Sequence, residues 1–204
     1  LPGGYVFTTL SAAAPDAVNN DSDAGAGGLT GCVTLSSGEN ELDVDAGLYQ
    51  PASLGDTVFV DNNGNGVYDA GDTAKDGVTV KLFYCADTAM TTPVQTDVTD
   101  ASGNYLFENL APGAYKVQFV LPGGYVFTTL STVAPDAVNN DSDAGTGGLT
   151  DCGTLSSGET ELDVDAGVSP PGGLGETRWR DLTGNGIAAG SPDSARREIT
   201  GPPG

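Results

Sequence analysis

The sequence contains no histidine, only one methionine and one tryptophan, and just seven lysine and arginine residues in 204. Without histidine, neither a Ser-His-Asp nor a Cys-His catalytic arrangement can be built, and a zinc site loses its usual nitrogen ligand. No apolar run approaches the roughly 18 residues that a membrane-spanning helix needs. These absences argue against the common hydrolases, zinc proteins and membrane insertion of this segment.

Acidic residues dominate where basic residues are scarce. The 28 Asp and Glu residues give a formal net charge of -21, which repels nucleic acid and anionic membrane surfaces. So strong an excess also destabilises a compact fold by self-repulsion unless cations offset it. A candidate cation site is therefore the first feature to look for.

The stretch from residue 61 to residue 72 has the spacing of a calcium-binding loop. It reads D-N-N-G-N-G-V-Y-D-A-G-D, with oxygen-bearing side chains at positions 1, 3, 5, 9 and 12 and a glycine at position 6. The residue at position 7 would offer its backbone carbonyl. The predicted ligands are Asp61, Asn63, Asn65, Val67, Asp69 and Asp72.

Two departures from the usual calcium loop predict a modest affinity. Aspartate replaces the bidentate glutamate at position 12, and asparagine replaces aspartate at positions 3 and 5. The alternative is a solvated Asn/Asp/Gly turn between strands. Residues 57–60 alternate like a strand, so a calcium site here would lack the helices of an EF-hand.

Internal repetition determines the domain organisation. Residues 1–53 return as residues 121–173, and 42 of the 53 positions are identical. The joints between repeats are only a few residues long, so neighbouring repeats should be closely tethered. We predict a repeat of about 120 residues in three parts: the C-terminal half of one repeat at 1–50, a complete repeat at 54–168, and the start of a divergent repeat at 174–204.

Within the complete repeat, apolar residues recur with period two. Tyr115, Val117 and Phe119 share one face, and Leu162–Val164 is expected as a short strand near the end. Turn signals such as D-A-S-G, A-P-G and P-G-G separate the runs. We count seven or eight short strands and no convincing helix, which predicts an antiparallel β-sandwich with an aromatic core.

A second acidic cluster precedes the end of the repeat. The D-S-D spacing lets two carboxylates converge from one turn, and a carboxylate of the last strand, Asp163 or Asp165, could join them. On spacing alone, a metal site and a solvated acidic loop are equally supported. The cluster comprises Asp136, Asp141, Asp143 and Asp165, with a repeat copy at Asp16, Asp21 and Asp23.

Five motifs together resemble the B-type repeat of Sdr-class bacterial surface proteins. They are S-L-G-D-T-V-F-V-D-N-N-G-N-G-V-Y-D at 53–69, G-N-Y-L-F-E-N-L-A-P-G-A-Y-K-V-Q-F at 103–119, L-P-G-G-Y-V-F-T at 121–128, N-N-D-S-D at 139–143 and D-V-D-A-G at 163–167. The resemblance covers the complete repeat and both fragments, and it extends to the wider Cna B-type, transthyretin-like group of surface modules.

This resemblance implies tandem immunoglobulin-like β-sandwich domains that are stiffened by Ca²⁺. It implies a rigid extracellular stalk or filament of a surface or secreted protein, whose partners are adjacent repeats or identical chains in a fibre. It also favours the metal-site interpretation of the second acidic cluster. The alternative function is an adhesin module that binds a host ligand, a glycan or a neighbouring cell.

The three cysteines fit this setting. Cys32 and Cys152 are repeat equivalents, so the complete repeat holds Cys85 and Cys152. In an oxidising extracellular setting we predict that these two form a disulfide, the alternative being two buried reduced thiols. Cys32 would pair with the counterpart of Cys85 in a preceding repeat.

An enzymatic function is not predicted. A glycosidase needs two carboxylates across a cleft, whereas these acids lie at metal-loop spacing in a small domain. The near-identity of the two repeat copies favours a structural role. The divergent segment at 174–204, which carries Trp179, keeps the adhesin alternative open.

Overall fold

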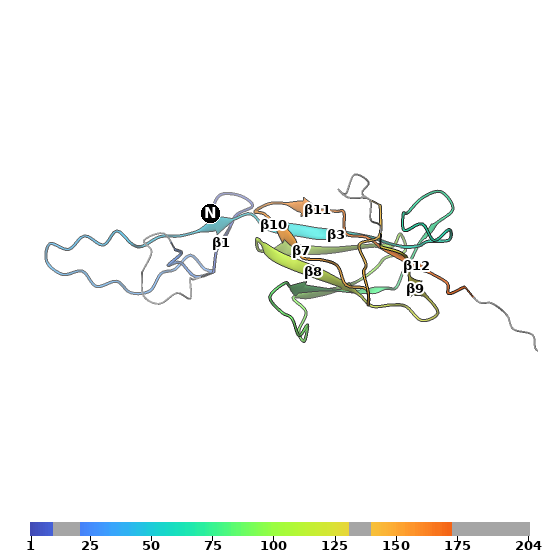
Figure 1. Cartoon of the computed structure of the whole chain (residues 1–204). Helices are drawn as coiled ribbons and strands as arrows, with labels where there is room; N and C mark the ends of the chain where they lie inside the picture. The colour runs from blue at the N-terminus through green and yellow to red at the C-terminus, as the bar shows by residue number, and fades with distance from the viewer. Residues whose placement is uncertain (10–20, 131–139, 173–204) are drawn as a thin grey trace, which may run out of the picture. The chain divides into compact units, whose positions relative to one another are not determined.

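The computed structural model describes residues 1–9, 21–130 and 140–172, and within these ranges the chain forms strands and no helix (Figure 1). No helix able to cross a membrane occurs among these residues. The segment predicted as a divergent repeat, and the predicted ligands Asp16 and Asp136, lie outside the described residues. The strands are β1 Val6–Phe7, β2 Leu48–Tyr49, β3 Ala52–Val60, β4 Thr73–Ala74, β5 Thr79–Tyr84, β6 Gln95–Val98, β7 Asn104–Leu110, β8 Gly113–Phe119, β9 Val126–Phe127, β10 Gly153–Leu155, β11 Thr160–Glu161 and β12 Ala166–Ser169.

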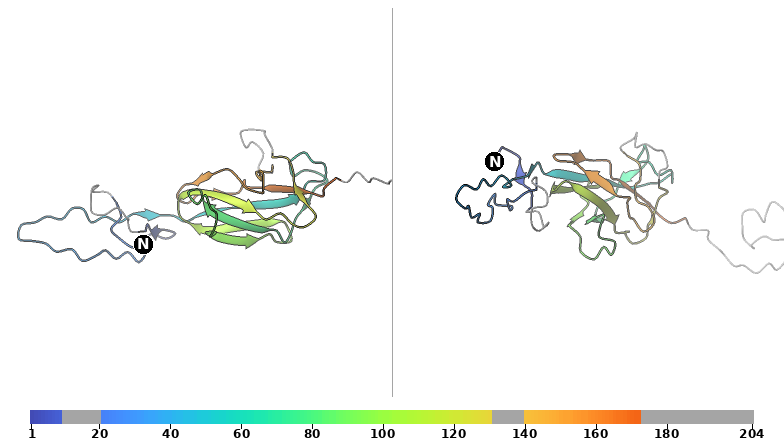
Figure 2. Two further views of the ribbon diagram at one scale, coloured as in Figure 1. Left: turned by 60° about the horizontal axis from the view of Figure 1, so that its bottom comes forward. Right: turned by 60° about the vertical axis from the view of Figure 1, so that its left-hand side comes forward.

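Two sheets form the complete repeat, as Figures 1 and 2 show. One has the order β10-β8-β5-β6 and is antiparallel throughout. The other has the order β11-β3-β12-β9, and β4 and β7 also pair with β3. The predicted β-sandwich is therefore confirmed, and the nine-residue strand β3 organises one of its layers.

The sequence pattern did not reveal two parallel pairings within this layer. β3 pairs in parallel with β11 and with β12, which lie about a hundred residues later in the chain. Such pairing joins the start of the repeat to its end and leaves no turn signal between the partners. The strand expected at Leu162–Val164 is not formed, because β11 ends at Glu161 and β12 begins at Ala166.

The core lies between the two sheets and is largely the predicted one. Tyr115, Val117 and Phe119 of β8 are at most 2% exposed, and each such side chain contributes roughly 1.5–3 kcal/mol by leaving water. β5 departs from strict alternation, because Leu82 and its neighbour Phe83 are both buried. On this edge of the core, the loop after β5 is held by Lys116, whose Nζ donates to the Asp87 carbonyl at 2.7 Å.

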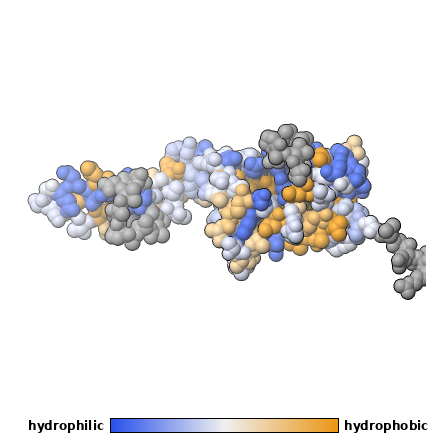
Figure 3. Space-filling model, in the orientation of Figure 1, coloured by the Kyte–Doolittle hydropathy of each residue, from blue (hydrophilic) through white to orange (hydrophobic). Residues whose placement is uncertain are grey.

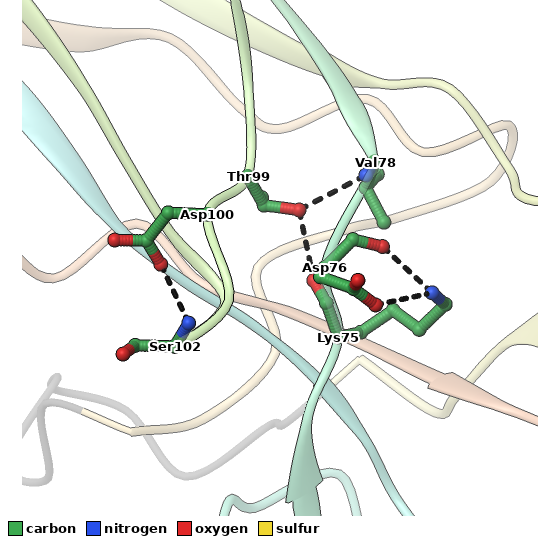
Figure 4. Close-up of polar contacts among 6 residues, drawn as sticks. All are labelled: Lys75, Asp76, Val78, Thr99, Asp100 and Ser102. Atoms are coloured by element: carbon green, nitrogen blue, oxygen red, sulfur yellow. Dashed lines mark hydrogen bonds and ion pairs between the residues drawn. The ribbon is translucent and has the colours of Figure 1, made fainter.

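A buried hydroxyl fixes the approach to β5 and lies next to the turn that connects β6 to β7 in the other sheet (Figure 4). Thr99 is 4% exposed; its Oγ1 donates to the Lys75 carbonyl at 2.8 Å and accepts the Val78 N–H at 2.9 Å. The Asp100 carboxylate accepts the Ser102 N–H at 2.8 Å, which closes the turn that the D-A-S-G signal predicted.

The N-terminal copy of the repeat forms its own small sheet. β1 and β2 pair Val6 with Tyr49 and Phe7 with Leu48. Each partner lies 120 positions before a partner in the β9–β12 pairing. The same local sequence therefore makes the same pairing in both copies. Residues Leu1–Pro171 form one compact unit.

Candidate metal centre

The loop predicted to bind calcium begins directly after β3, at a carboxylate with no exposed surface. Asp61 is 0% exposed, and its oxygens accept the N–H groups of Gly64 at 2.6 Å and Gly66 at 2.8 Å. The Thr128 hydroxyl also donates to Asp61. Both glycines have a φ near +80°, a conformation that glycine adopts without strain. These bonds hold residues 61–66 in a tight turn around the Asp61 carboxylate.

These hydrogen bonds decide the ionisation of Asp61. Burial acts to raise the pKa of its carboxyl, but the hydrogen bonds from Thr128 and from the backbone N–H groups of Gly66, Gly64 and Asn65 outweigh it and lower the pKa below the ordinary value. Asp61 is therefore a buried, charged carboxylate that neutral donors stabilise.

The remaining predicted ligands close the loop around Asp69. Its two carboxylate oxygens accept the side-chain amides of Asn63 at 3.1 Å and Asn65 at 2.8 Å. The amide oxygen of Asn65 accepts the Val67 N–H at 2.8 Å. The Asp72 carboxylate accepts the Asp69 N–H at 3.0 Å. All six predicted positions thus belong to one hydrogen-bonded loop.

The donor set fits Ca²⁺ in chemistry, since it offers carboxylate, amide and carbonyl oxygens and no sulfur or imidazole. Its side chains are hydrogen-bonded to one another, and both asparagine amides present nitrogen to Asp69. Among the described residues, no group of three or more Asp, Glu, His or Cys side chains is gathered as a metal site would need. A bound cation would require the two amides to turn their oxygens inward.

The second acidic segment packs directly against this loop, a proximity that the sequence did not predict. The Tyr68 N–H donates to the Asn140 carbonyl at 2.6 Å, and the Ser142 N–H donates to the Gly66 carbonyl at 2.8 Å. Val67 and Asp141 form a β-bridge. The two candidate sites, separated by about seventy residues in sequence, are neighbours in the fold.

Asp143 and Asp165 are also brought together, as the prediction for the second site required. The Asp165 N–H donates to the Asp143 carboxylate at 2.8 Å, and the Asp143 N–H donates to the Asp165 carbonyl at 3.0 Å. The repeat copy has the same geometry, with the Asp45 N–H donating to Asp23 at 2.8 Å. This unit therefore forms from local sequence alone.

Asp165 is a buried carboxyl with a strongly perturbed pKa. It is 2% exposed, and its Oδ1 accepts the Thr57 N–H at 2.9 Å. Burial raises the pKa of Asp165 to about 8; the bond from Thr57 opposes this, and the negative charges of Asp56, Asp143 and Asp141 add to it. A cation close to this group would remove the penalty for ionising it.

Sequence reasoning missed Asp56 as a member of this acidic group. It lies on β3 beside Thr57, whose hydroxyl donates to it at 2.9 Å. Burial raises the pKa of Asp56, the Thr57 hydroxyl lowers it, and the charge of Asp163 raises it further. The sequence did contain one signal for Asp56: L-G-D-T at 54–57 is repeated as L-G-E-T at 174–177, so the position is acidic in both copies.

A disulfide joins Cys85, which follows β5, to Cys152, which precedes β10, with Cα atoms 5.9 Å apart. This is the pairing that the sequence predicted. Cys32, the repeat equivalent of Cys152, is a free and exposed thiol.

Two curated relatives from staphylococci align with nearly the whole chain. Serine-aspartate repeat-containing protein D of Staphylococcus aureus (strain Newman) is 32% identical over 204 residues, which is 98% of this chain and 14% of that protein. Serine-aspartate repeat-containing protein F of Staphylococcus epidermidis is 32% identical over 186 residues, 89% of this chain and 10% of that protein. The chain thus spans about a seventh of the length of its relative in S. aureus.

A weaker structural likeness was found to the minor pilin GBS52 of Streptococcus agalactiae, with 15% identity, a TM-score of 0.41, and coverage of 71% of this chain and 61% of that one. The family model of the SdrD B-like domain matches residues 52–168, almost the range predicted as the complete repeat. With more than half of its length matched, the chain belongs to the SdrD B-like domain family.

Proposed function

We propose that the chain is a non-enzymatic structural repeat of an extracellular stalk or filament, and that Ca²⁺ stabilises each repeat. The observation that carries the structural role is the direct succession of repeat copies. β2 is the equivalent of β12 in the preceding copy and ends at Tyr49. β3, the first strand of the complete repeat, begins at Ala52. Only two residues separate the copies, so neighbouring repeats are closely tethered.

Calcium stabilisation is supported by the placement of the acidic groups. Asp61, Asn63, Asn65, the Val67 carbonyl, Asp69 and Asp72 would hold the ion. When bound, Ca²⁺ would supply positive charge that offsets the carboxylate repulsion, and it would lock a loop that the 140–143 segment already contacts. The group around Asp165 is the proposed second site, because its burial makes an uncompensated charge costly.

The proposed location is the cell surface or a secreted filament. The Cys85–Cys152 disulfide supports it, because disulfides persist in oxidising compartments. The proposed partners are adjacent repeats or identical chains, and the net charge of -21 disfavours nucleic acid.

The deciding experiment is a thermal melt of the full chain in calcium and in excess chelator. Calcium at about 100 times its dissociation constant should add roughly 2.7 kcal/mol per site. Asp69→Asn should reduce this gain and leave the melt in chelator nearly unchanged, because Asp69 is exposed and binds only within the loop. Asp151→Asn, which removes the same charge at an exposed position, is the control and should keep the full gain. An unchanged melt of the wild-type chain would refute calcium stabilisation.

An adhesin function is the second candidate, and the surface of the repeat supports it. Figure 3 shows apolar areas on the visible face of the sandwich, and Leu121, Leu130 and Leu162 are each 43–45% exposed. A cleft of about 370 Å³ is lined by apolar side chains such as Leu54 and Leu130 together with acids. Binding of the chain to whole cells or a glycan array, abolished by Leu130→Asp, would establish this function; its absence would leave the structural role alone.

A further inference from the structure

Of the two residues between the repeat copies, Gln50 and Pro51, the first is hydrogen-bonded to the turn between β10 and β11 of the complete repeat. The Gln50 N–H donates to the Ser157 hydroxyl at 2.8 Å. The Gln50 carbonyl accepts the Gly158 N–H at 2.9 Å. Both main-chain groups of this linker residue are therefore paired with a turn more than a hundred positions later in the sequence.

These bonds extend the parallel ladder between β3 and β11 backwards across the joint. The Ser53 N–H donates to the Glu159 carbonyl at 2.9 Å, and the register then continues with Ser53 opposite Thr160. The linker thus lies beside the turn in continuation of this ladder, held by one main-chain hydrogen bond and one bond to the Ser157 hydroxyl.

The turn that receives the linker is shaped by its own residues. The Ser156 N–H donates to the Glu159 carboxylate at 2.5 Å, and Gly158 has a φ of +75°. The repeat copy makes the same turn without a linker on it: the Ser36 N–H donates to Glu39 at 2.6 Å, and Gly38 has a φ of +83°.

Gly38 and Gly158 occupy equivalent positions in the two turns, and their surroundings differ where the linker lies. A Cβ built on Gly38 would meet nothing within 4 Å, whereas one on Gly158 would lie 2.8 Å from the Gln50 side-chain oxygen. The same turn therefore forms in both copies, and the glycine at position 158 leaves room for Gln50. This is the behaviour expected of a preorganised binding surface.

We propose that the turn Ser156–Glu159 is a docking site for the linker of the preceding repeat, which holds the joint at residues 50–51 in a fixed conformation. The occupant is the main chain of Gln50. The contact is made within the described residues, and none of the predicted calcium ligands takes part in it. Its consequence for a stalk, that this joint is stiff, rests on the proposed structural function.

The next joint of the chain lacks the same donor. Tyr49 and Gln50 are replaced at the equivalent positions by Ser169 and Pro170. A proline has no N–H to donate to a serine hydroxyl, so half of the contact cannot form there. The two joints are therefore chemically different, although the repeats on either side of the first are nearly identical.

Amide hydrogen exchange in the ¹⁵N-labelled full chain tests this proposal. A substitution in the linker is followed at an amide of the turn, and a substitution in the turn is followed at an amide of the linker. Gln50→Pro, which installs the residue of the second joint, should speed exchange of the Gly158 N–H about five-fold. Ser157→Ala should do the same at the Gln50 N–H. Five-fold corresponds to ~1 kcal/mol, the usual net contribution of one hydrogen bond.

Ser37→Ala, in the turn without a linker, is the matched control and should alter neither amide. If Gln50→Pro lowers the melting temperature of the whole repeat, faster exchange in that variant no longer reports on docking alone. The result for Ser157→Ala then decides whether the linker docks, because this substitution leaves the backbone chemistry unchanged. Docking is overturned if Gly158 in the wild-type chain exchanges as fast as Gly38, or if neither variant changes the opposite amide. The exchange is measured both in calcium and in chelator. If calcium leaves the melt of the wild-type chain unchanged while both variants still speed exchange at the opposite amide, the calcium proposal is refuted and docking stands.

Discussion

Replacing Asp165 by asparagine tests whether the buried acidic group destabilises the repeat when no cation is bound. The asparagine side chain is nearly isosteric with that of aspartate, and its amide oxygen can still accept the Thr57 N–H that Asp165 Oδ1 accepts at 2.9 Å. Its NH₂ group would face carboxylates instead of adding a charge to them. The substitution therefore removes the charge and keeps the hydrogen bond.

The sign follows from the raised pKa, which moves from 3.8 to about 8 in the folded chain. Below pH 3.8 the Asp165 carboxyl is protonated in both the folded and the unfolded chain, and its contribution to stability is fully present. Between these values the folded state holds a proton that the unfolded chain has lost, so stability falls as pH rises and levels off above 8. At about 1.36 kcal/mol per pKa unit the ceiling is roughly 6 kcal/mol; we expect about 2 kcal/mol, because relaxation and water penetration relieve buried charges.

The assay is urea unfolding in chelator at about pH 5 and about pH 8, followed by circular dichroism, with stability extrapolated linearly. The wild-type chain should lose about 2 kcal/mol between these pH values through Asp165, and Asp165→Asn should abolish that loss. Asp151→Asn, at an exposed site, should retain the wild-type slope. If the free energy of unfolding of Asp165→Asn depends on pH as it does in the wild-type chain, Asp165 is already ionised in the folded chain at neutral pH without a bound cation, and the reasoning is refuted.

Two further perturbations test the packing and the covalent link. Gly148→Ala should destabilise the repeat by at least ~2 kcal/mol in thermal melts, because the new Cβ would lie 2.3 Å from the Phe119 carbonyl and the Phe127 ring; Gly147→Ala, with φ of +77° and open space, should cost only about 1 kcal/mol, and equal losses would contradict the packing argument. Reducing the Cys85–Cys152 disulfide, which spans 67 positions, should cost about 4 kcal/mol by the chain-entropy estimate. A melting temperature that reductant leaves unchanged would contradict that figure.

Much of the fold could be predicted because its signals are local. Period-two alternation in β8 identified Tyr115, Val117 and Phe119 as core residues, since alternate side chains of a strand share one face. The D-A-S-G turn was readable for the same reason: the Asp100 side chain reaches N–H groups only two to four residues away. The copy at residues 21–47 shows the same principle, because it forms the Asp23–Asp45 contact in a fragment of a repeat.

The candidate site was only partly predictable. The ligand spacing of the loop is a local property, so Asp61–Asp72 was identified as one unit. The contact of that loop with residues 140–143 is not, because no spacing rule links positions about seventy residues apart. Asp56 was missed because its significance arises from the neighbours that β3 and β12 bring to it.

The sequence by itself predicted the all-β class, the repeat length and the position of the joints, and it placed two cysteines in one repeat, because these follow from periodicity, self-similarity and composition. Only the tertiary structure decided which acids are buried together and what the linker touches. The parallel pairing of β3 with β11 and β12 brings the two ends of the repeat side by side. That single arrangement raises the pKa of Asp165, encloses Asp61, and places the turn at Gly158 where Gln50 enters, since charge and burial depend on distances that the chain acquires only on folding.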